Sequence, residues 1–272
     1  MSLVQSIIYG LISGLSELLP VSSQANQAIL MRLFGLETRE PLRDLLIHTA
    51  VLFALFTGCK SVIAKIHRER TLSGSRRRRN ISDSTYEFRL IRSATVPMLL
   101  LLLVYISTKS IEGNMTTLAL FLIINGIILM IPEYSRQANK DARSMSGLDG
   151  ILMGLSGGLS AFPGISRIGF ISSYALLRGA DKQKVVNWAF LLSIPALILL
   201  CLLDFIFIFT SGIGSISFLI VLGYIFSAVF AYIGAYLSTL LVRFLAVRTG
   251  YSGFAYYCWG AALFSMILYL IV

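Results

Sequence analysis

The stretch SFLIVLGYIFSAVFAYIGAYLSTLLV, residues 217–242, decides the fold class, because no charged residue interrupts it. A helix of about 20 mostly apolar residues spans the hydrocarbon core of a bilayer. Five further segments of this kind lie at 43–63, 89–108, 115–132, 185–208 and 252–271. The six segments predict an all-α integral membrane protein that forms a single membrane domain over residues 1–272.

The composition supports this class. The chain is 56% hydrophobic and 13% charged, whereas a soluble domain carries about 25% charged residues. A very apolar soluble helix bundle is the alternative, and uncharged runs as long as 217–242 argue against it. The three cysteines lie in apolar segments without CxxC spacing, so neither a disulfide framework nor a zinc site is indicated.

Basic residues gather after the first predicted span. The segment 64–88 holds Lys65, Arg68, Arg70 and four consecutive arginines at 76–79, and the whole chain has a formal net charge of +10. Such a run could bind DNA, but in membrane proteins Lys and Arg accumulate in cytoplasmic loops. We therefore predict that loop 64–88 is cytoplasmic and that no nucleic acid is bound. Counting spans then places the C-terminus outside.

Two apolar segments are broken near their middle and do not fit as full spans. Residues 3–34 are interrupted around Glu17 and Pro20, and residues 148–177 around Pro163 and Arg167. Irregular backbone at membrane depth is tolerated only where protein or a water-filled cavity surrounds it. Both segments are therefore predicted to be re-entrant helical hairpins. The span count requires the first to enter from outside and the second from inside.

The two hairpins also resemble each other. GLISGLS at 10–16 precedes PVSS at 20–23, and GLSGGLS at 154–160 precedes PGISR at 163–167. Each hairpin is followed by three spans, which predicts an inverted repeat with one half at about 1–133 and the other at about 148–272. Chance similarity between Gly- and Ser-rich stretches is the alternative. Inverted repeats with broken helices place a polar site near the midplane, where the breaks face each other.

The residues at the breaks suit a phosphate-bearing ligand. Ser22 and Ser23 follow a proline break, where the N–H groups of a helix N-terminus are free to bind an anion. Arg167, at the other break, has forked donors that match phosphate oxygens. Glu17 could act as a base, a proton carrier or the partner of a cation. The simpler alternative is a Glu17–Arg167 ion pair that only braces the hairpins.

These residues lie in stretches that resemble a known family. ELLPVSS at 17–23 and PGISRIG at 163–169 resemble the two signatures of the undecaprenyl-diphosphate phosphatases, the bacitracin-resistance membrane phosphatases. Asp44 with His48, and FLLSIP at 190–195, give two weaker matches. The order and spacing agree over essentially the whole chain, and the two signatures together are specific.

The resemblance implies hydrolysis of a polyprenyl diphosphate to the monophosphate, which recycles a lipid carrier of cell-envelope glycans. It also implies an active site that opens to the outer face and support by a divalent cation, Mg²⁺ or Ca²⁺, whose ligands are unknown. The expected partners are the polyprenyl diphosphate and membrane lipids, with a homodimer left open. The matching residues are Glu17, Ser22, Ser23 and Arg167 as catalytic groups, and Gly164 and Ser166 as substrate contacts.

The chain departs from the family at two important positions. Ser13 stands where the family has the first glutamate of a pair, and Asn26 stands where it has a histidine. Both are expected at the substrate, but asparagine cannot act as an acid or base. His48 could replace the missing histidine if its helix lines the cavity. More often, a helical His with an Asp four residues earlier, here Asp44, is only a hydrogen-bonded pair.

Three functions therefore stay open after the sequence is read. The first is a phosphatase that uses Glu17 as its sole base and a serine or water as nucleophile. The second is a transporter or flippase of a polyprenyl phosphate lipid, which would keep the anion site and dispense with the acid–base groups. The third is a non-catalytic lipid-binding paralogue.

Overall fold

The computed structural model describes residues 1–36, 39–75, 83–108, 111, 113–135, 139–211 and 217–271. Within these ranges the chain forms helices and their connections, without a β-strand. The α-helices are, in chain order, α1 (Leu3–Leu18), α2 (Ser23–Leu33), α3 (Pro41–Gly58), α4 (Lys60–Ser75), α5 (Asp83–Leu102), α6 (Tyr105–Thr108), α7 (Met115–Met130), α8 (Gly147–Gly158), α9 (Arg167–Leu177), α10 (Lys182–Ser211), α11 (Phe218–Arg248) and α12 (Ser252–Ile271).

Six helical segments are long and apolar enough to cross a membrane, as the sequence predicted. They are Pro41–Gly58, Ser84–Thr108, Met115–Tyr134, Lys182–Thr210, Phe218–Arg248 and Ser252–Ile271. Their outward faces stay apolar: on α11, for example, Val229, Leu237 and Phe244 are each about half exposed. Exposed apolar faces of this extent suit hydrocarbon rather than water. The chain is therefore a multi-pass, all-α membrane protein.

The prediction of a loop over 64–88 was wrong in its local structure. The first span, expected at 43–63, ends at Gly58, and α4 then continues as a helix from Lys60 to Ser75. Residues 83–88 already belong to α5. Lys and Arg are good helix formers, so a basic segment beside a membrane can stay helical. The four arginines at 76–79 lie outside the described residues.

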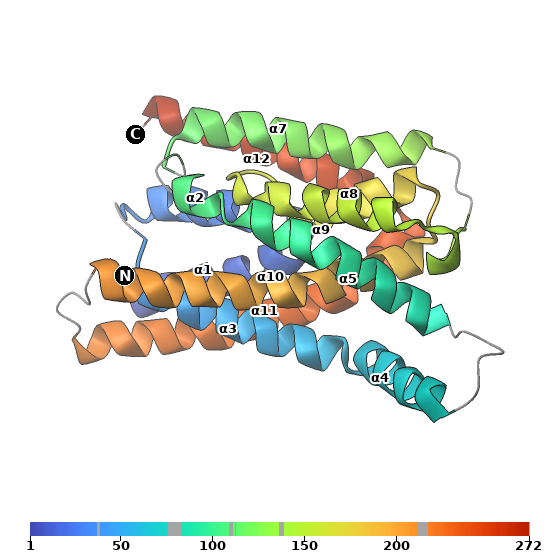
Figure 1. The fold of residues 1–272 in the computed structure, drawn as a ribbon. Helices are drawn as coiled ribbons and strands as arrows, with labels where there is room; N and C mark the ends of the chain where they lie inside the picture. The colour runs from blue at the N-terminus through green and yellow to red at the C-terminus, as the bar shows by residue number, and fades with distance from the viewer. Residues whose placement is uncertain are drawn as a thin grey trace.

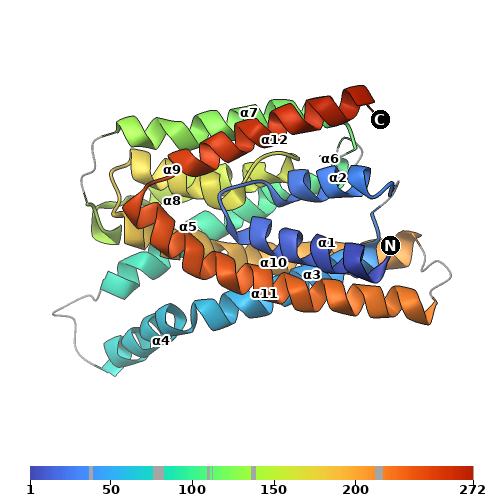
Figure 2. The same cartoon turned by 180° about the vertical axis from the view of Figure 1, so that it is seen from behind.

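The two broken segments enter the bundle from opposite ends. Both chain termini lie at one end of the bundle, and α4 extends toward the other (Figures 1 and 2). Helix α1 starts at the end that holds the termini, and α2 returns to it (Figure 2). Helices α8 and α9 form the corresponding pair from the other end (Figure 1). The two breaks, Leu19–Ser22 and 159–166, therefore meet inside the bundle.

Small residues set the packing of α1 against α11. A Cβ added at Gly10 would lie 2.1 Å from the carbonyl oxygen of Ser227. A Cβ added at Gly14 would lie 2.0 Å from that of Ala231. Membrane helices use such small-xxx-small pairs to bring their backbones close together, since apolar side chains gain little by leaving lipid.

Helix α8 packs on α5 by the same means. A Cβ at Gly154 would lie 2.1 Å from the carbonyl oxygen of Ala94, and one at Gly158 would lie 2.9 Å from that of Met98. In the similar stretches GLISGLS and GLSGGLS, Gly154 and Gly158 correspond to Gly10 and Gly14. These two glycine pairs thus make the same kind of close contact with the backbone of a neighbouring helix.

Gly14→Leu is expected to prevent α1 from packing on α11. Because the Cβ position already overlaps a backbone oxygen, the helices must separate, and overpacking of this kind costs about 1–3 kcal/mol or more. We expect loss of the monodisperse peak in detergent size-exclusion chromatography and a lower thermal midpoint. Gly260→Leu in α12 is the matched control, because a Cβ there meets no atom within 4 Å. Equal behaviour of the two variants would contradict the packing described for α1.

Candidate active site

Ser22 joins the first break to the second. It is the N-cap of α2, and its hydroxyl oxygen accepts a hydrogen bond from the backbone N–H of Ala25 at 3.3 Å. The same oxygen accepts from the N–H of Gly164 at 3.0 Å. Gly164 adopts a φ of 106°, a conformation that side-chain-bearing residues rarely adopt. Ser22 is 1% exposed and acts as a structural cap.

Ser166 has the corresponding place in the second break. It is the N-cap of α9, its hydroxyl accepts from the N–H of Gly169 at 3.1 Å, and it donates to the carbonyl of Leu19 at 3.3 Å. Each serine thus caps its own helix and also bonds the opposite break. The N-termini of α2 and α9 are therefore held close together, which concentrates the partial positive charge of two helix ends.

Asn125, on α7, ties the two breaks together and was not singled out from the sequence. Its Oδ1 accepts from the N–H of Ser166 at 2.9 Å, and its Nδ2 donates to the carbonyl of Pro20 at 3.4 Å. The side chain is completely buried. The available signal was an amide side chain in the middle of the apolar run 115–132, since polar residues inside membrane helices bond to their neighbours.

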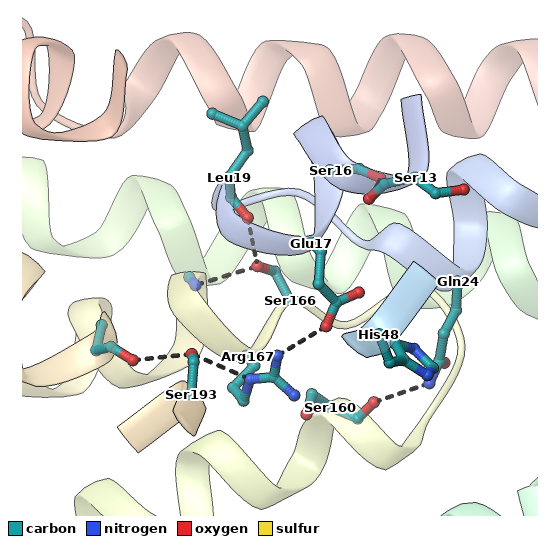
Figure 3. A network of polar contacts seen from close by, with 12 residues as sticks. Ser13, Ser16, Glu17, Leu19, Gln24, His48, Ser160, Ser166, Arg167 and Ser193 are labelled. Atoms are coloured by element: carbon teal, nitrogen blue, oxygen red, sulfur yellow. Dashed lines mark hydrogen bonds and ion pairs between the residues drawn. The ribbon is translucent and has the colours of Figure 1, made fainter. Parts of the chain in front are cut away.

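Glu17 and Arg167 form a buried ion pair between the last turn of α1 and the first residue of α9. Arg167 Nη2 donates to Glu17 Oε1 at 2.7 Å, and Arg167 Nε donates to Ser193 Oγ on α10 at 3.2 Å (Figure 3). The side chains are 7% and 5% exposed. Arginine at the bilayer centre costs about 2.5–3.5 kcal/mol on insertion scales. The pairing with Glu17 offsets part of that cost.

A small pocket opens beside this pair. Five of the residues predicted for the site line it, namely Glu17, Ser23, His48, Ser166 and Arg167. Glu17, Arg167 and His48 lie around the same space (Figure 3). Ser22 and Gly164 are not among its lining residues, because their hydrogen bond closes the contact between the two breaks.

The two positions that depart from the family also lie outside the pocket lining. Ser13 is fully buried, and its hydroxyl has no hydrogen-bond partner among the described residues. Asn26 donates from Nδ2 to the carbonyl of Ser22 at 2.7 Å and accepts from the hydroxyl of Tyr257. Asn26 therefore supports the α2 N-cap in this structure.

His48 lies on α3 and its partner is not the one expected from its own helix. Its Nδ1 lies 2.6 Å from Oδ2 of Asp204, on α10. Asp44, four residues before it, instead faces Arg39 at 4.0 Å and Arg43 at 3.6 Å. The expectation of a local Asp44–His48 pair was wrong, because Asp44 lies with the arginines at the start of α3 and a carboxylate from another helix reaches the imidazole.

Arg39 supplies a second cationic side chain to the pocket. It lies in the segment between α2 and α3, and its Nη1 donates to the hydroxyl of Tyr105 at 3.3 Å. The pocket therefore has two guanidinium groups, Arg39 and Arg167, and one carboxylate, Glu17, in its lining. Guanidinium groups bind phosphate oxygens through paired, charge-assisted hydrogen bonds.

The divalent cation that the resemblance implies would find the carboxylates at and beside this pocket already engaged by other side chains. Glu17 Oε1 is already bound by Arg167, and the carboxylate of Asp204 is bound to His48. Among the described residues, no group of three His, Cys, Asp or Glu side chains is placed to hold a metal ion.

Comparison with known proteins gives a consistent result. The family model described as bacitracin resistance protein BacA matches residues 6–264. A protein named undecaprenyl-diphosphatase from Carboxydothermus hydrogenoformans is 33% identical over 207 residues, which cover 75% of this chain and 74% of that protein. One of the same name from Methanobrevibacter smithii is 28% identical over 268 residues, or 95% of each chain.

Proposed function

The chain belongs to the bacitracin resistance protein BacA family, and we propose that it is a membrane phosphatase that hydrolyses undecaprenyl diphosphate, or a closely similar polyprenyl diphosphate. The products are the polyprenyl monophosphate and inorganic phosphate, and the reaction recycles a lipid carrier of cell-envelope glycans. The relatives named above carry the name of this activity. The function rests on this membership together with the chemistry of the pocket.

The pocket around Arg167 is the observation that carries the proposal. Arg167 begins α9, and Ser23 and Gln24 begin α2, so two helix N-termini and a guanidinium border one space. Both features bind phosphate oxygens, the helix ends by N–H groups and dipole, and the guanidinium by paired donors. Arg39 lies in the same lining and suits the second phosphoryl group of a diphosphate.

The Glu17–Arg167 pair prepares the site for its substrate. Without a phosphate, Glu17 neutralises Arg167 at 2.7 Å and holds the guanidinium at the pocket. When the terminal phosphoryl group binds, its oxygens take over donors of Arg167. Arg167 and the helix N-termini then stabilise the charge that develops as the bond to the bridging oxygen breaks. Of the serine pair, Ser23 lines the pocket, so its hydroxyl or a water molecule is the nucleophile.

We further propose that the two broken segments are re-entrant hairpins and that the halves at about 1–133 and about 148–272 form an inverted repeat. Two similarities support this arrangement. Gly10 and Gly154 each lie against the backbone of a neighbouring helix, and Ser22 and Ser166 each form a hydrogen bond with the opposite break. In this orientation the segment 64–88 is cytoplasmic and the C-terminus is outside. The two termini lie at one end of the bundle and α4 extends toward the opposite end, which is consistent with that orientation (Figure 1).

Phosphorus NMR of purified protein in detergent with undecaprenyl diphosphate tests the function. A detergent solution has no separate compartments, so a transporter would leave the lipid chemically unchanged. We expect the native chain to produce polyprenyl monophosphate and inorganic phosphate in equal amounts. The assay is run with Mg²⁺ and with EDTA, so that added cations are covered. Tight binding of a diphosphate that stays intact in both arms would contradict a phosphatase and favour the transporter or lipid-binding alternative.

A further inference from the structure

The pocket contains one imidazole, and a carboxylate from a different helix holds it. His48 Nδ1 lies 2.6 Å from Asp204 Oδ2, and the two side chains are 8% and 1% exposed. Because Asp204 occupies Nδ1, the nitrogen left for chemistry is Nε2, to which the described residues provide no hydrogen-bond partner. A buried carboxylate in this place fixes the ring and its tautomer and stabilises the imidazolium.

The location of the pair argues against a role in packing alone. A carboxylate within a membrane helix is costly, and such groups face functional cavities by default. His48 lines the same pocket as Glu17 and Arg167. If His48 and Asp204 served only to pack α3 against α10, two apolar side chains could do the same without burying a charge. A proton acceptor at the phosphate site, in contrast, requires an imidazole and a carboxylate that orients it.

Glu17 is less suited to accept a proton in the resting site, because Arg167 occupies its Oε1 at 2.7 Å. The charged groups around His48 come from several elements that pack together here. They are Asp204 on α10, Glu17 on α1, Asp44 on α3, Arg167 on α9, and Arg39 before α3. Only Asp204 bonds to the ring among the described residues.

We propose that His48 is the general base of the reaction and that Asp204 is its positioning residue; this rests on the proposed phosphatase function. A water oxygen attacks the terminal phosphorus, and a proton of that water passes to His48 Nε2. The bond from this phosphorus to the bridging oxygen breaks, and its electron pair stays on the bridging oxygen of the polyprenyl monophosphate. The released inorganic phosphate or solvent then takes the proton from His48. The pair thus supplies the acid–base group that is missing at Asn26.

The test measures phosphate release from undecaprenyl diphosphate by purified full-length variants over a range of pH. His48→Gln is expected to lower kcat by roughly 10²–10⁴-fold with little change in KM, because glutamine can hydrogen-bond but cannot take the proton. Asp204→Asn is expected to lower kcat by at least roughly 10²-fold, because it removes the charge that holds the tautomer. We expect the native chain to lose activity at low pH as His48 becomes protonated, and this loss should be absent in His48→Gln. Added imidazole should partly restore His48→Ala.

His67→Gln is the matched control, because His67 is the second of the two histidines in the chain and lies on α4, away from the pocket lining. It should release phosphate at the native rate. Each variant is also measured for thermal stability and for binding of undecaprenyl monophosphate, so that misfolded protein is recognised.

The outcomes separate this inference from the proposed function. Native kcat and an unchanged pH profile in His48→Gln, with an active native chain, would overturn the role of His48 and leave the phosphatase intact. So would an inactive His48→Ala that binds the monophosphate and is not restored by imidazole, because that pattern indicates a structural role. No phosphate release by the native chain would instead refute the proposed function itself.

Discussion

Arg167→Lys is expected to lower the rate of phosphate release from undecaprenyl diphosphate by about 10²–10³-fold, the usual cost of losing one preorganised donor. Arg167 donates from Nη2 to Glu17 and from Nε to Ser193 at the same time. Lysine keeps the charge but has a single ammonium on a flexible chain, so it cannot hold two partners and a phosphate in a fixed plane. The measurement is the initial rate at equal amounts of folded protein.

Arg178→Lys is the control for the same chemical change. Arg178 lies just after α9 and pairs with Asp149, and its side chain is 52% exposed. We expect a native rate from it. A near-native rate from Arg167→Lys would mean that the Glu17–Arg167 pair only braces the two breaks, and would move the phosphate site elsewhere.

Asn125→Leu is expected to remove both stability and activity. Leucine is similar in size but leaves the N–H of Ser166 and the carbonyl of Pro20 without their amide partner. Each buried group left unsatisfied costs about 1–3 kcal/mol. Because Ser166 and Pro20 belong to different breaks, their relative position should relax and the phosphate site should loosen. The measurements are the thermal midpoint in detergent and the rate of phosphate release.

Asn187→Leu on α10 is the matched control, because none of the hydrogen bonds described for the chain involves its side chain. It should keep native stability and a native rate. If Asn125→Leu behaved in the same way, the contacts of Ser22 with Gly164 and of Ser166 with Leu19 would suffice to hold the breaks together, and the bridging role of Asn125 would be wrong.

The six spans could be predicted from the sequence because each is a long apolar run, and hydrocarbon allows few other structures for it. The breaks around Pro20 and Pro163 were also visible, since proline and glycine interrupt helices in a recognisable pattern. The meeting of Glu17 and Arg167 was predicted from their places at the two breaks, and a bracing ion pair between them was the alternative. The spans and the breaks could be predicted because they depend on local composition and on the large free-energy cost of exposing polar groups to hydrocarbon.

The remaining features depend on the direction of single side chains. Nothing in the sequence links His48 to Asp204, 156 residues away, whereas Asp44 at four residues was an obvious and incorrect candidate. The neighbours Ser22 and Ser23 look equivalent in the sequence. At the start of α2, however, Ser22 faces the second break and Ser23 faces the pocket. Helix register decides such choices, and it is settled by the packing of the whole bundle.

The most direct test of a phosphatase site at the two breaks compares phosphate release by the native chain and by Glu17→Gln. Both are purified in detergent, matched for the amount of folded protein, and given undecaprenyl diphosphate. Glutamine keeps the size of the side chain but removes the charge that holds Arg167 at 2.7 Å. We expect steady release from the native chain and a rate at least about 10²-fold lower from the variant, because Arg167 is no longer held in place. Equal rates from the two proteins would contradict this location of the site, and no release from either would contradict the phosphatase activity.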